Sequence, residues 1–146
     1  MSISKMKAEV ESVKGLKTVS RVRDFEFTMD EPANLGGTDT GMNPVEALLS
    51  AVGGCKVIVA QSFARVHKID LNHIKVTVTG DLDTDGFTGK NPDAKIGLIN
   101  LKTHYQFDAK NTREELEAFA DFIDATCPVI DTIVNKPKME REIEIL

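Results

Sequence analysis

The chain has 146 residues and a formal net charge of −5, with 41% hydrophobic and 28% charged residues. This composition is ordinary for a globular protein, and the length fits one domain, residues 1–146, with a core of its own. The chain has no basic patch, one Tyr and no Trp, so nucleic acid is not an expected partner. No apolar run approaches the ~20 residues of a membrane helix and the first residues lack an apolar signal core, so we expect no membrane partner and a cytoplasmic location.

The N-terminal part of the chain alternates apolar and polar residues as strands do. This pattern predicts a half-buried strand over residues 6–13, a turn at 14–15 and a second strand over 18–29. On the second strand Arg21 and Arg23 share a face with Phe25 and Phe27, so one or both arginines would face the core. The alternative is that both lie near the strand end and extend to water. Residues 30–42 form a loop rich in Gly, Asp, Pro and Thr.

The central stretch predicts one long helix over residues 44–67, with Pro44 at its first position after a capping Asn43. Nearly every face of its first half is small or apolar, which predicts burial on most sides. Glycines inside a helix cost about 1 kcal/mol each relative to Ala. The pair at 53–54 therefore indicates close approach of another backbone, or room for a small molecule beside Cys55.

The second half of the chain supplies the remaining elements. We expect strands over residues 74–79 and 99–107, separated by a polar connection over 81–94, and a helix that starts near residue 111. Because Pro128 suits a first helical position, Cys127 is predicted to be the N-cap of a short third helix, before a final strand over 138–146. The order β-β-α-β-β-α-α-β predicts an α+β fold, a largely antiparallel sheet packed on a long buried central helix.

The two cysteines are the only residues that suggest chemistry. Burial alone would raise the pKa of the Cys55 thiol, unless a cation such as Arg23 or Arg21 offsets it, whereas a helix N-terminus would lower the pKa of Cys127. The simpler interpretation is that both are small buried hydrophobic residues. Three scattered histidines give no metal-ligand spacing, and residues 83–86 lack the later ligands of a calcium loop. We therefore expect no metal and no cofactor.

Two stretches together resemble a known family. The first contains Leu35-Gly36-Gly37-Thr38, then Asn43-Pro44-Val45-Glu46 and Gly53-Gly54-Cys55, and the second is Cys127-Pro128-Val129. These residues and the order of elements are similar to the OsmC/Ohr family, which includes osmotically inducible protein C and the organic hydroperoxide resistance proteins. The context of Cys55 resembles the OsmC-like branch.

The resemblance implies an intertwined homodimer with active sites at the subunit interface, and thiol peroxidase activity on organic hydroperoxides. It implies that Cys55 is the peroxidatic cysteine and that Cys127 resolves its sulfenic acid to a disulfide, which a dithiol reductant reopens. The family also uses an arginine beside the thiolate. No motif identifies it here, so Arg23 is chosen from strand parity, with Arg21 second.

One position departs from the peroxidase pattern. Peroxidase members carry an acid directly after the Pro, which orients the arginine, whereas this chain has Val45 there and Glu46 one residue later. Glu46 is the candidate replacement, although at about 100° per residue it lies roughly opposite Cys55 around the helix. Two alternatives remain: a binding protein for a small apolar ligand, and a thiol sensor or sulfur carrier that uses Cys55.

Overall fold

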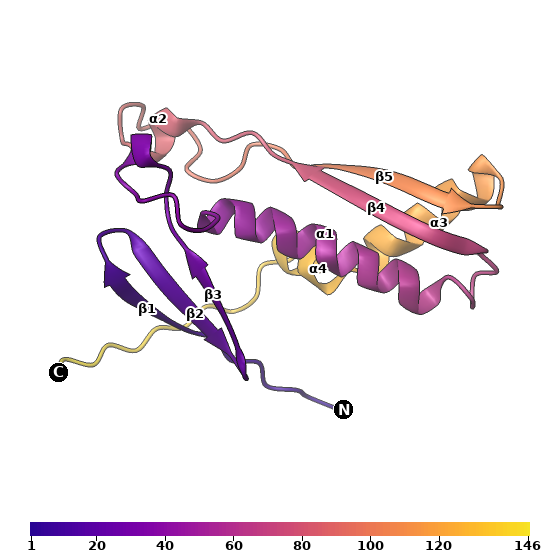
Figure 1. Cartoon of the computed structure of the whole chain (residues 1–146), viewed down its shortest axis with the longest axis horizontal. Helices are drawn as coiled ribbons and strands as arrows, with labels where there is room; N and C mark the ends of the chain where they lie inside the picture. The colour runs from indigo at the N-terminus through magenta and orange to yellow at the C-terminus, as the bar shows by residue number, and fades with distance from the viewer. The chain divides into compact units, whose positions relative to one another are not determined.

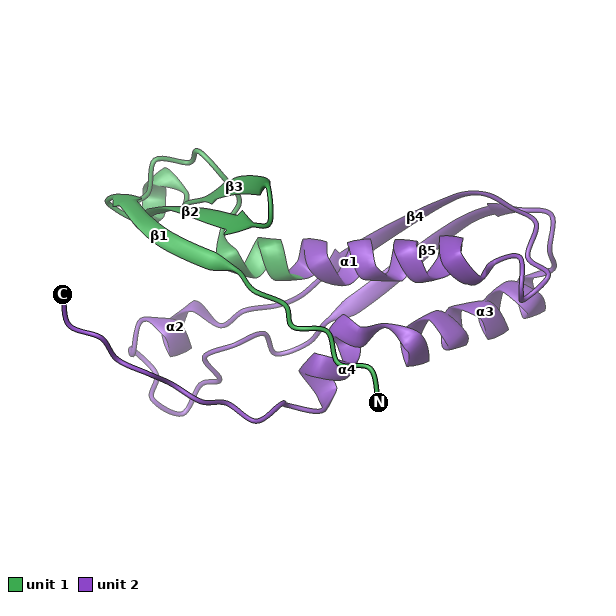
Figure 2. Cartoon of the chain, turned by 90° about the horizontal axis from the view of Figure 1, so that it is seen from below, with its two compact units in different colours: residues 1–48 green, residues 49–146 purple.

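A computed structural model describes residues 1–146, which divide into two compact units, residues 1–48 and 49–146 (Figure 2). Helix α1, Pro44–Phe63, begins in the first unit and continues into the second. Each unit is described by itself below. The expectation of one domain over residues 1–146 stays a prediction.

The first unit holds a three-stranded antiparallel sheet in the order β1-β2-β3 (Figure 1). Its strands are β1, Glu9–Lys14, β2, Lys17–Val22, and β3, Phe25–Met29. A 3-10 helix, η1, Ala33–Leu35, lies in the loop that follows. All six residues of β1 are exposed, so the prediction of a half-buried first strand is wrong for the single chain.

The predicted second strand is two strands joined by a tight turn. Val22 pairs with Phe25, which leaves Arg23 and Asp24 as the turn, and Arg23 has a left-handed φ of 56°. The parity argument therefore fails, because alternation along one strand does not continue through a hairpin. Phe25 and Phe27 are 65% and 46% exposed, so their face is not in the core of the chain.

Asp30 organises the loop that leads to α1. Its carboxylate is 1% exposed and accepts hydrogen bonds from the backbone N–H groups of Glu31, Thr38 and Thr40 and from both threonine hydroxyls. These bonds, with that from the Thr38 side chain the largest influence, hold the pKa of Asp30 well below its usual range. Gly37 lies so close to this loop that a Cβ there would be 1.9 Å from the Glu31 carbonyl oxygen.

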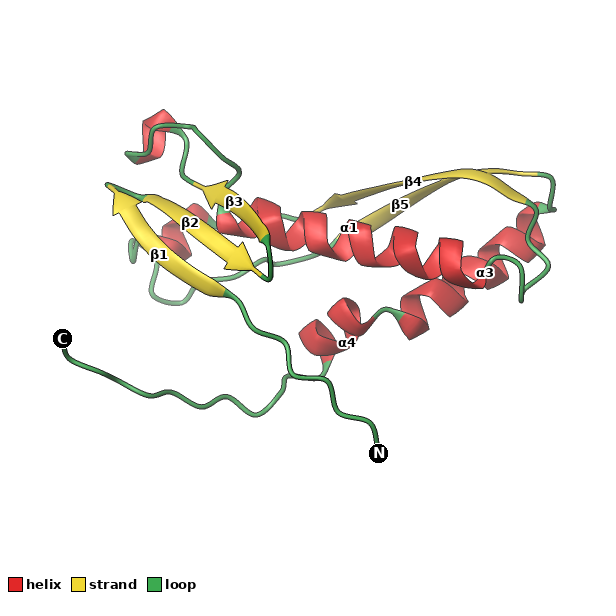
Figure 3. Cartoon of the chain, turned by 60° about the horizontal axis from the view of Figure 1, so that its bottom comes forward, coloured by secondary structure: helices red, strands yellow, loops and turns green.

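The second unit combines two long strands with the larger part of α1 and three further helices. Strand β4, Leu71–Thr79, is antiparallel to β5, Lys102–Ala109, and a short helix α2, Thr84–Phe87, lies in the connection between them. Helix α3, Arg113–Thr126, is followed directly by α4, Pro128–Val134 (Figure 3). One buried cluster joins α1, β4 and α3 with the loop before β4: Val59, Ala60, Ala64, Ile69, Ile74, Phe119 and Ile123. All pairings are antiparallel, as predicted, but they form two sheets rather than one.

Helix α1 is buried along one face only. The buried residues are Val52, Gly53, Lys56, Val59 and Ala60. Gly53 packs on β4, where a Cβ would lie 3.4 Å from Val78, while Gly54 faces open space. Burial on most sides is therefore not found in the single chain, and the helix ends at Phe63 rather than at residue 67.

Helix α1 is also long and apolar enough to span a membrane, with a mean hydropathy of 1.3. No segment of this kind was expected from the sequence, because no uninterrupted apolar run has that length. The core helix of a globular protein meets the same criterion. Helix α1 supplies two members of the buried cluster, Val59 and Ala60, and Ala64 follows just beyond its end.

The predicted C-terminal strand is not formed. Residues 135–146 contain no helix or strand, and Met139, Ile143 and Ile145 are 84%, 78% and 92% exposed. Alternation makes a segment suitable for a strand, but a strand needs an edge with which to pair. This segment has no such partner within the chain.

Candidate functional site

Helix α1 places Cys55 at the border between its buried and exposed faces. The helix begins with a reciprocal capping pair: the Glu46 N–H donates to the Asn43 side chain and the Asn43 N–H donates to the Glu46 carboxylate, both at 2.8 Å. Three turns later Cys55 is partly buried and packs against the core cluster. Its thiol is therefore partly accessible while the helix is held by the core.

Cys127 lies at the junction of α3 and α4. The Thr112 and Glu115 pair caps the start of α3, and the N–H of Cys127 donates to the Ile123 carbonyl at 3.1 Å to close its last turn. Pro128 then opens α4, since it needs no hydrogen bond at a first helical position. The prediction that Cys127 is an N-cap is confirmed, and the residue is 1% exposed.

The fold brings the two thiols together. The side chains of Cys55 and Cys127 are hydrogen-bonded to each other, and the backbone N–H of Val129, in the first turn of α4, donates to the Cys55 sulfur. Both cysteines are reduced. Two thiols in contact, one on α1 and one at the junction of α3 and α4, are candidates for oxidation to a disulfide.

The environment of Cys55 favours the protonated form of its thiol, because it raises the pKa. Burial is the largest influence that raises the pKa of Cys55, followed by the hydrogen bond with Cys127. The Val129 N–H and the charge of Lys56 act in the opposite direction but do not reverse the shift. The second unit by itself therefore does not activate Cys55 as a thiolate.

A buried lysine beside Cys55 was missed by the sequence reasoning. Lys56 is 3% exposed and forms an ion pair with Asp124, whose side chain is 50% exposed. The Tyr105 hydroxyl lies 2.6 Å from the same Asp124 oxygen and 3.3 Å from Lys56 Nζ, and Nζ also lies 5.4 Å from the centre of the Tyr105 ring. Burial, then the hydrogen bond with Asp124, raise the pKa of Tyr105 far above its usual range. A lysine inside an apolar helix was the available signal.

The other site residues predicted from the sequence lie in the first unit. Arg21 pairs with Glu11 and Glu26, at 2.5 and 3.0 Å, on the exposed sheet. Arg23, in the β2–β3 turn, has its guanidinium 5.0 Å from the centre of the Phe25 ring. Glu46 is in the α1 capping pair. Two carboxylates, those of Glu11 and Glu26, therefore neutralise Arg21, whereas Arg23 has no ion pair with either of them.

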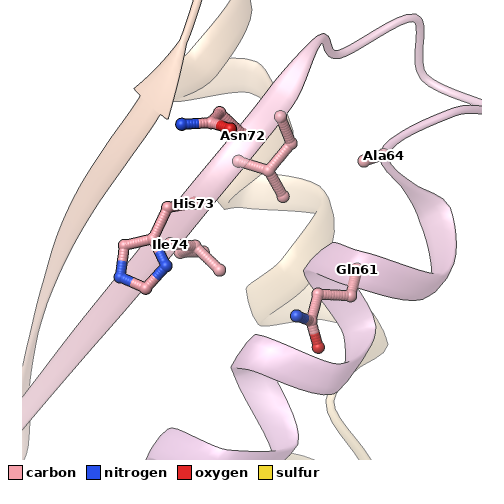
Figure 4. A pocket seen from close by; sticks show the side chains of 6 residues that line it. Gln61, Ala64, Asn72, His73 and Ile74 are labelled. Atoms are coloured by element: carbon pink, nitrogen blue, oxygen red, sulfur yellow. The ribbon is translucent and has the colours of Figure 1, made fainter.

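A separate hollow of about 170 Å³ lies between the end of α1 and the start of β4. Gln61 and Ala64 line it from the helix side, and residues 71–74 line it from the strand (Figure 4). No Cys, Asp, Glu, Lys or Arg lines this hollow, so it offers no thiol chemistry.

Comparison with known proteins identifies related sequences. The family described as OsmC-like protein matches residues 37–142, which include both cysteines. A hydroperoxide reductase of Mycoplasma pneumoniae is 28% identical over 122 residues, covering 83% of this chain and 81% of the relative. A hydroperoxide reductase of Mycoplasma genitalium is 29% identical over 130 residues, covering 88% and 86%.

Solved structures share the fold. An OsmC-like protein from Mycoplasma pneumoniae has a TM-score of 0.77 at 25% identity, over 91% of this chain and 89% of that one. An organic hydroperoxide resistance protein from Legionella pneumophila has a TM-score of 0.73 at 19% identity, over 92% and 93% of the two chains. At that identity the second likeness concerns the fold alone.

Proposed function

Since this chain belongs to the family of OsmC-like proteins, we propose that it is a thiol-dependent peroxidase that reduces organic hydroperoxides through Cys55 and Cys127. The observation that carries the proposal is the contact between the thiol of Cys55, on α1, and that of Cys127, at the junction of α3 and α4. The related hydroperoxide reductases support the substrate class.

The reaction has two steps. The Cys55 thiolate attacks the outer oxygen of the hydroperoxide, an S–O bond forms as the O–O bond breaks, and the leaving alkoxide takes a proton to become an alcohol. The sulfenic acid on Cys55 then reacts with Cys127 to give a disulfide and water. A dithiol reductant returns both cysteines to thiols and restores the two electrons.

The first step needs a cation beside Cys55. Burial raises the pKa of this thiol, and Lys56 is already paired with Asp124, so a further positive charge is required. We assign this charge to Arg23, because Glu11 and Glu26 already neutralise Arg21. Arg23→Met should slow peroxide reduction far more than Arg21→Met, and equal rates would contradict the assignment.

Glu46 is proposed to orient the arginine, in the role that the family's acid has next to the Pro. Its carboxylate already caps α1, so removal would also destabilise the helix. Glu46→Gln separates the two roles, because an amide keeps the capping geometry but loses the charge. Reduced turnover with unchanged unfolding would support the catalytic role. Unchanged turnover would leave Glu46 a capping residue.

The proposal includes a homodimer. Helix α1 leaves Ile58 64% exposed on the face opposite its buried residues, and Leu48, near the start of the helix, is 41% exposed. Such a face is typical of a surface that another chain covers. Light scattering should give a dimer mass for the wild type, and Ile58→Glu should shift it toward the monomer. A wild-type monomer at micromolar concentration would contradict this part.

The test of the function is mass spectrometry of reduced protein after brief exposure to one equivalent of cumene hydroperoxide, without added reductant. We expect rapid loss of two hydrogens, mapped to a Cys55–Cys127 disulfide, and no such product from Cys55→Ser. Cys127→Ser should reduce one peroxide and then stop as a sulfenic acid. Unmodified thiols in the wild type would overturn the proposal.

A second candidate is a binding protein in which the thiols only line a site. The observations that favour it are Val45, in place of the family's acid, and the raised pKa of Cys55. Both thiols would then stay unmodified in the experiment above, and a small apolar ligand would be found in the purified protein by extraction and mass spectrometry.

A further inference from the structure

An ion pair runs beside the sulfur pair and joins the same two helices. Lys56 directly follows Cys55 on α1, and Asp124 precedes Cys127 by three residues in the last turn of α3. Residues three apart lie on the same face of a helix, so Asp124 and Cys127 approach α1 together. Lys56 and Asp124 therefore join α1 to the end of α3, one residue from Cys55 and three residues from Cys127.

Tyr105 makes this connection rigid. Its hydroxyl lies 2.6 Å from the Asp124 carboxylate and 3.3 Å from Lys56 Nζ, while its ring lies beneath the same ammonium group at 5.4 Å. Tyr105 lies on β5. Its ring also stacks on the ring of Phe107, with 5.5 Å between the ring centres. The three polar groups thus tie together α1, α3 and β5, and each restrains the other two.

The charge of Lys56 is not available to activate the thiol. Its only carboxylate partner, Asp124, compensates it, and its effect on the pKa of Cys55 is the smallest of the influences on that group. The side chain is nevertheless 3% exposed, although burial of an ammonium group is costly. A buried charge with little electrostatic effect on its neighbour indicates a role in geometry.

We propose that Lys56, Asp124 and Tyr105 form a positioning triad that holds Cys127 within bonding distance of Cys55 while the disulfide forms. This inference rests on the proposed function, since it concerns the second step of that reaction. The triad touches neither peroxide nor sulfur in the step, so its members are positioning residues. Their effect is on the approach of one sulfur to the other.

The step that the triad controls is the condensation of the two sulfurs. The Cys127 sulfur, as a thiolate, attacks the Cys55 sulfur of the sulfenic acid, an S–S bond forms and the S–O bond breaks. The hydroxide that leaves takes the proton lost by Cys127 and departs as water. No further oxidant is needed, because the hydroperoxide has already removed two electrons from Cys55. The rate of such a step is sensitive to the position of the attacking atom, and about 1 Å of misplacement costs up to about a hundredfold.

The experiment follows the two steps separately in Lys56→Met, which keeps the length of the side chain and removes the charge. Reduced protein is mixed with one equivalent of cumene hydroperoxide in the presence of dimedone, which traps sulfenic acid, and quenched at intervals for mass spectrometry. We expect disulfide formation to slow about tenfold or more and the dimedone adduct on Cys55 to accumulate. Peroxide consumption in the first turnover should change by less than about threefold. Asp124→Asn should behave likewise, and Lys56→Arg should restore most of the rate.

Two matched controls change an exposed charge of the same kind. Lys75→Met lies on β4 and Asp121→Asn on α3, both outside the triad, and both should form the disulfide at the wild-type rate. Wild-type rates of closure in Lys56→Met and Asp124→Asn would overturn the inference. An equal slowing of both steps would also overturn it, because a general loss of structure would have that effect. Tyr105→Phe keeps the test open if a charge variant fails to fold, since it removes one hydroxyl only.

A second oxidant distinguishes failure of the triad from failure of the proposed function. Diamide converts two thiols to a disulfide without a sulfenic acid. One outcome is that the wild type does not react with the hydroperoxide but forms the disulfide with diamide faster than Lys56→Met does. This outcome would contradict the peroxidase proposal and still support the positioning triad. Equal rates of disulfide formation with diamide in wild type, Lys56→Met and Asp124→Asn would contradict the positioning role of the triad, regardless of the result with hydroperoxide.

Discussion

Asp124→Asn tests the energetics of the buried lysine. The substitution keeps the size of the side chain and removes the negative charge that faces Lys56, which is 3% exposed. Loss of one partner of a fully buried ion pair costs about 3–5 kcal/mol. Asp124 itself is 50% exposed, and the Tyr105 hydroxyl remains 3.3 Å from Lys56 Nζ, so part of the interaction with water and protein survives.

We therefore expect a loss of about 2 kcal/mol, within the range of about 1–3 kcal/mol for a buried polar group deprived of its partner. At about 2–4 °C per kcal/mol for a chain of this size, the midpoint of thermal unfolding should fall by about 4–8 °C. Urea unfolding followed by far-UV circular dichroism, at one fixed protein concentration, measures the free energy directly.

The control is Asp121→Asn, which removes the same charge from an exposed position on the same helix and should change the free energy of unfolding by less than about 0.5 kcal/mol. A result for Asp124→Asn within that same limit would refute the reasoning. It would mean that water reaches Lys56 and that the lysine is not a buried charge in solution.

Three further predictions concern other parts of the chain. Hydrogen bonds hold the pKa of Asp30 below its unfolded value, so its carboxylate should stabilise the fold above about pH 4 and lose this effect as the pH falls; Asp30→Asn should flatten the dependence of the unfolding free energy on pH between about 2 and 5, and an unchanged slope would contradict this. Phe119→Ala should lower the free energy of unfolding by about 3–5 kcal/mol, because the ring is 2% exposed, whereas Phe87→Ala, where the ring is 77% exposed, should lower it by less than about 1 kcal/mol. Similar urea midpoints for the two variants would exclude Phe119 from the core. Cys127 raises the pKa of Cys55, so Cys127→Ser should move the pH profile of Cys55 alkylation by iodoacetamide to lower pH, and a profile that stays or moves upward would argue against the contact.

Tertiary pairing decided several features that local patterns predicted incorrectly. The sequence over residues 18–29 alternates as one strand does, yet Arg23 adopts a left-handed φ of 56° and folds it into a hairpin. The alternation over residues 138–146 suits a strand, but no edge is available to it within the chain. Period and propensity describe what a segment can form, whereas pairing depends on a partner that is distant in sequence.

The sequence by itself determined the family, the order of most elements, the start of α1 at Pro44 and the N-cap position of Cys127, because these depend on local spacing and on capping and Pro residues. Only the tertiary structure decided that Cys127 meets Cys55, and that Lys56, in an apolar helix, is paired with Asp124 and Tyr105. The contact between the thiols was implied by resemblance alone, and the triad was not foreseen. Residues on α1, β5 and α3 come together only when the helices and strands pack around one core, and that packing is a property of the whole chain rather than of any one segment.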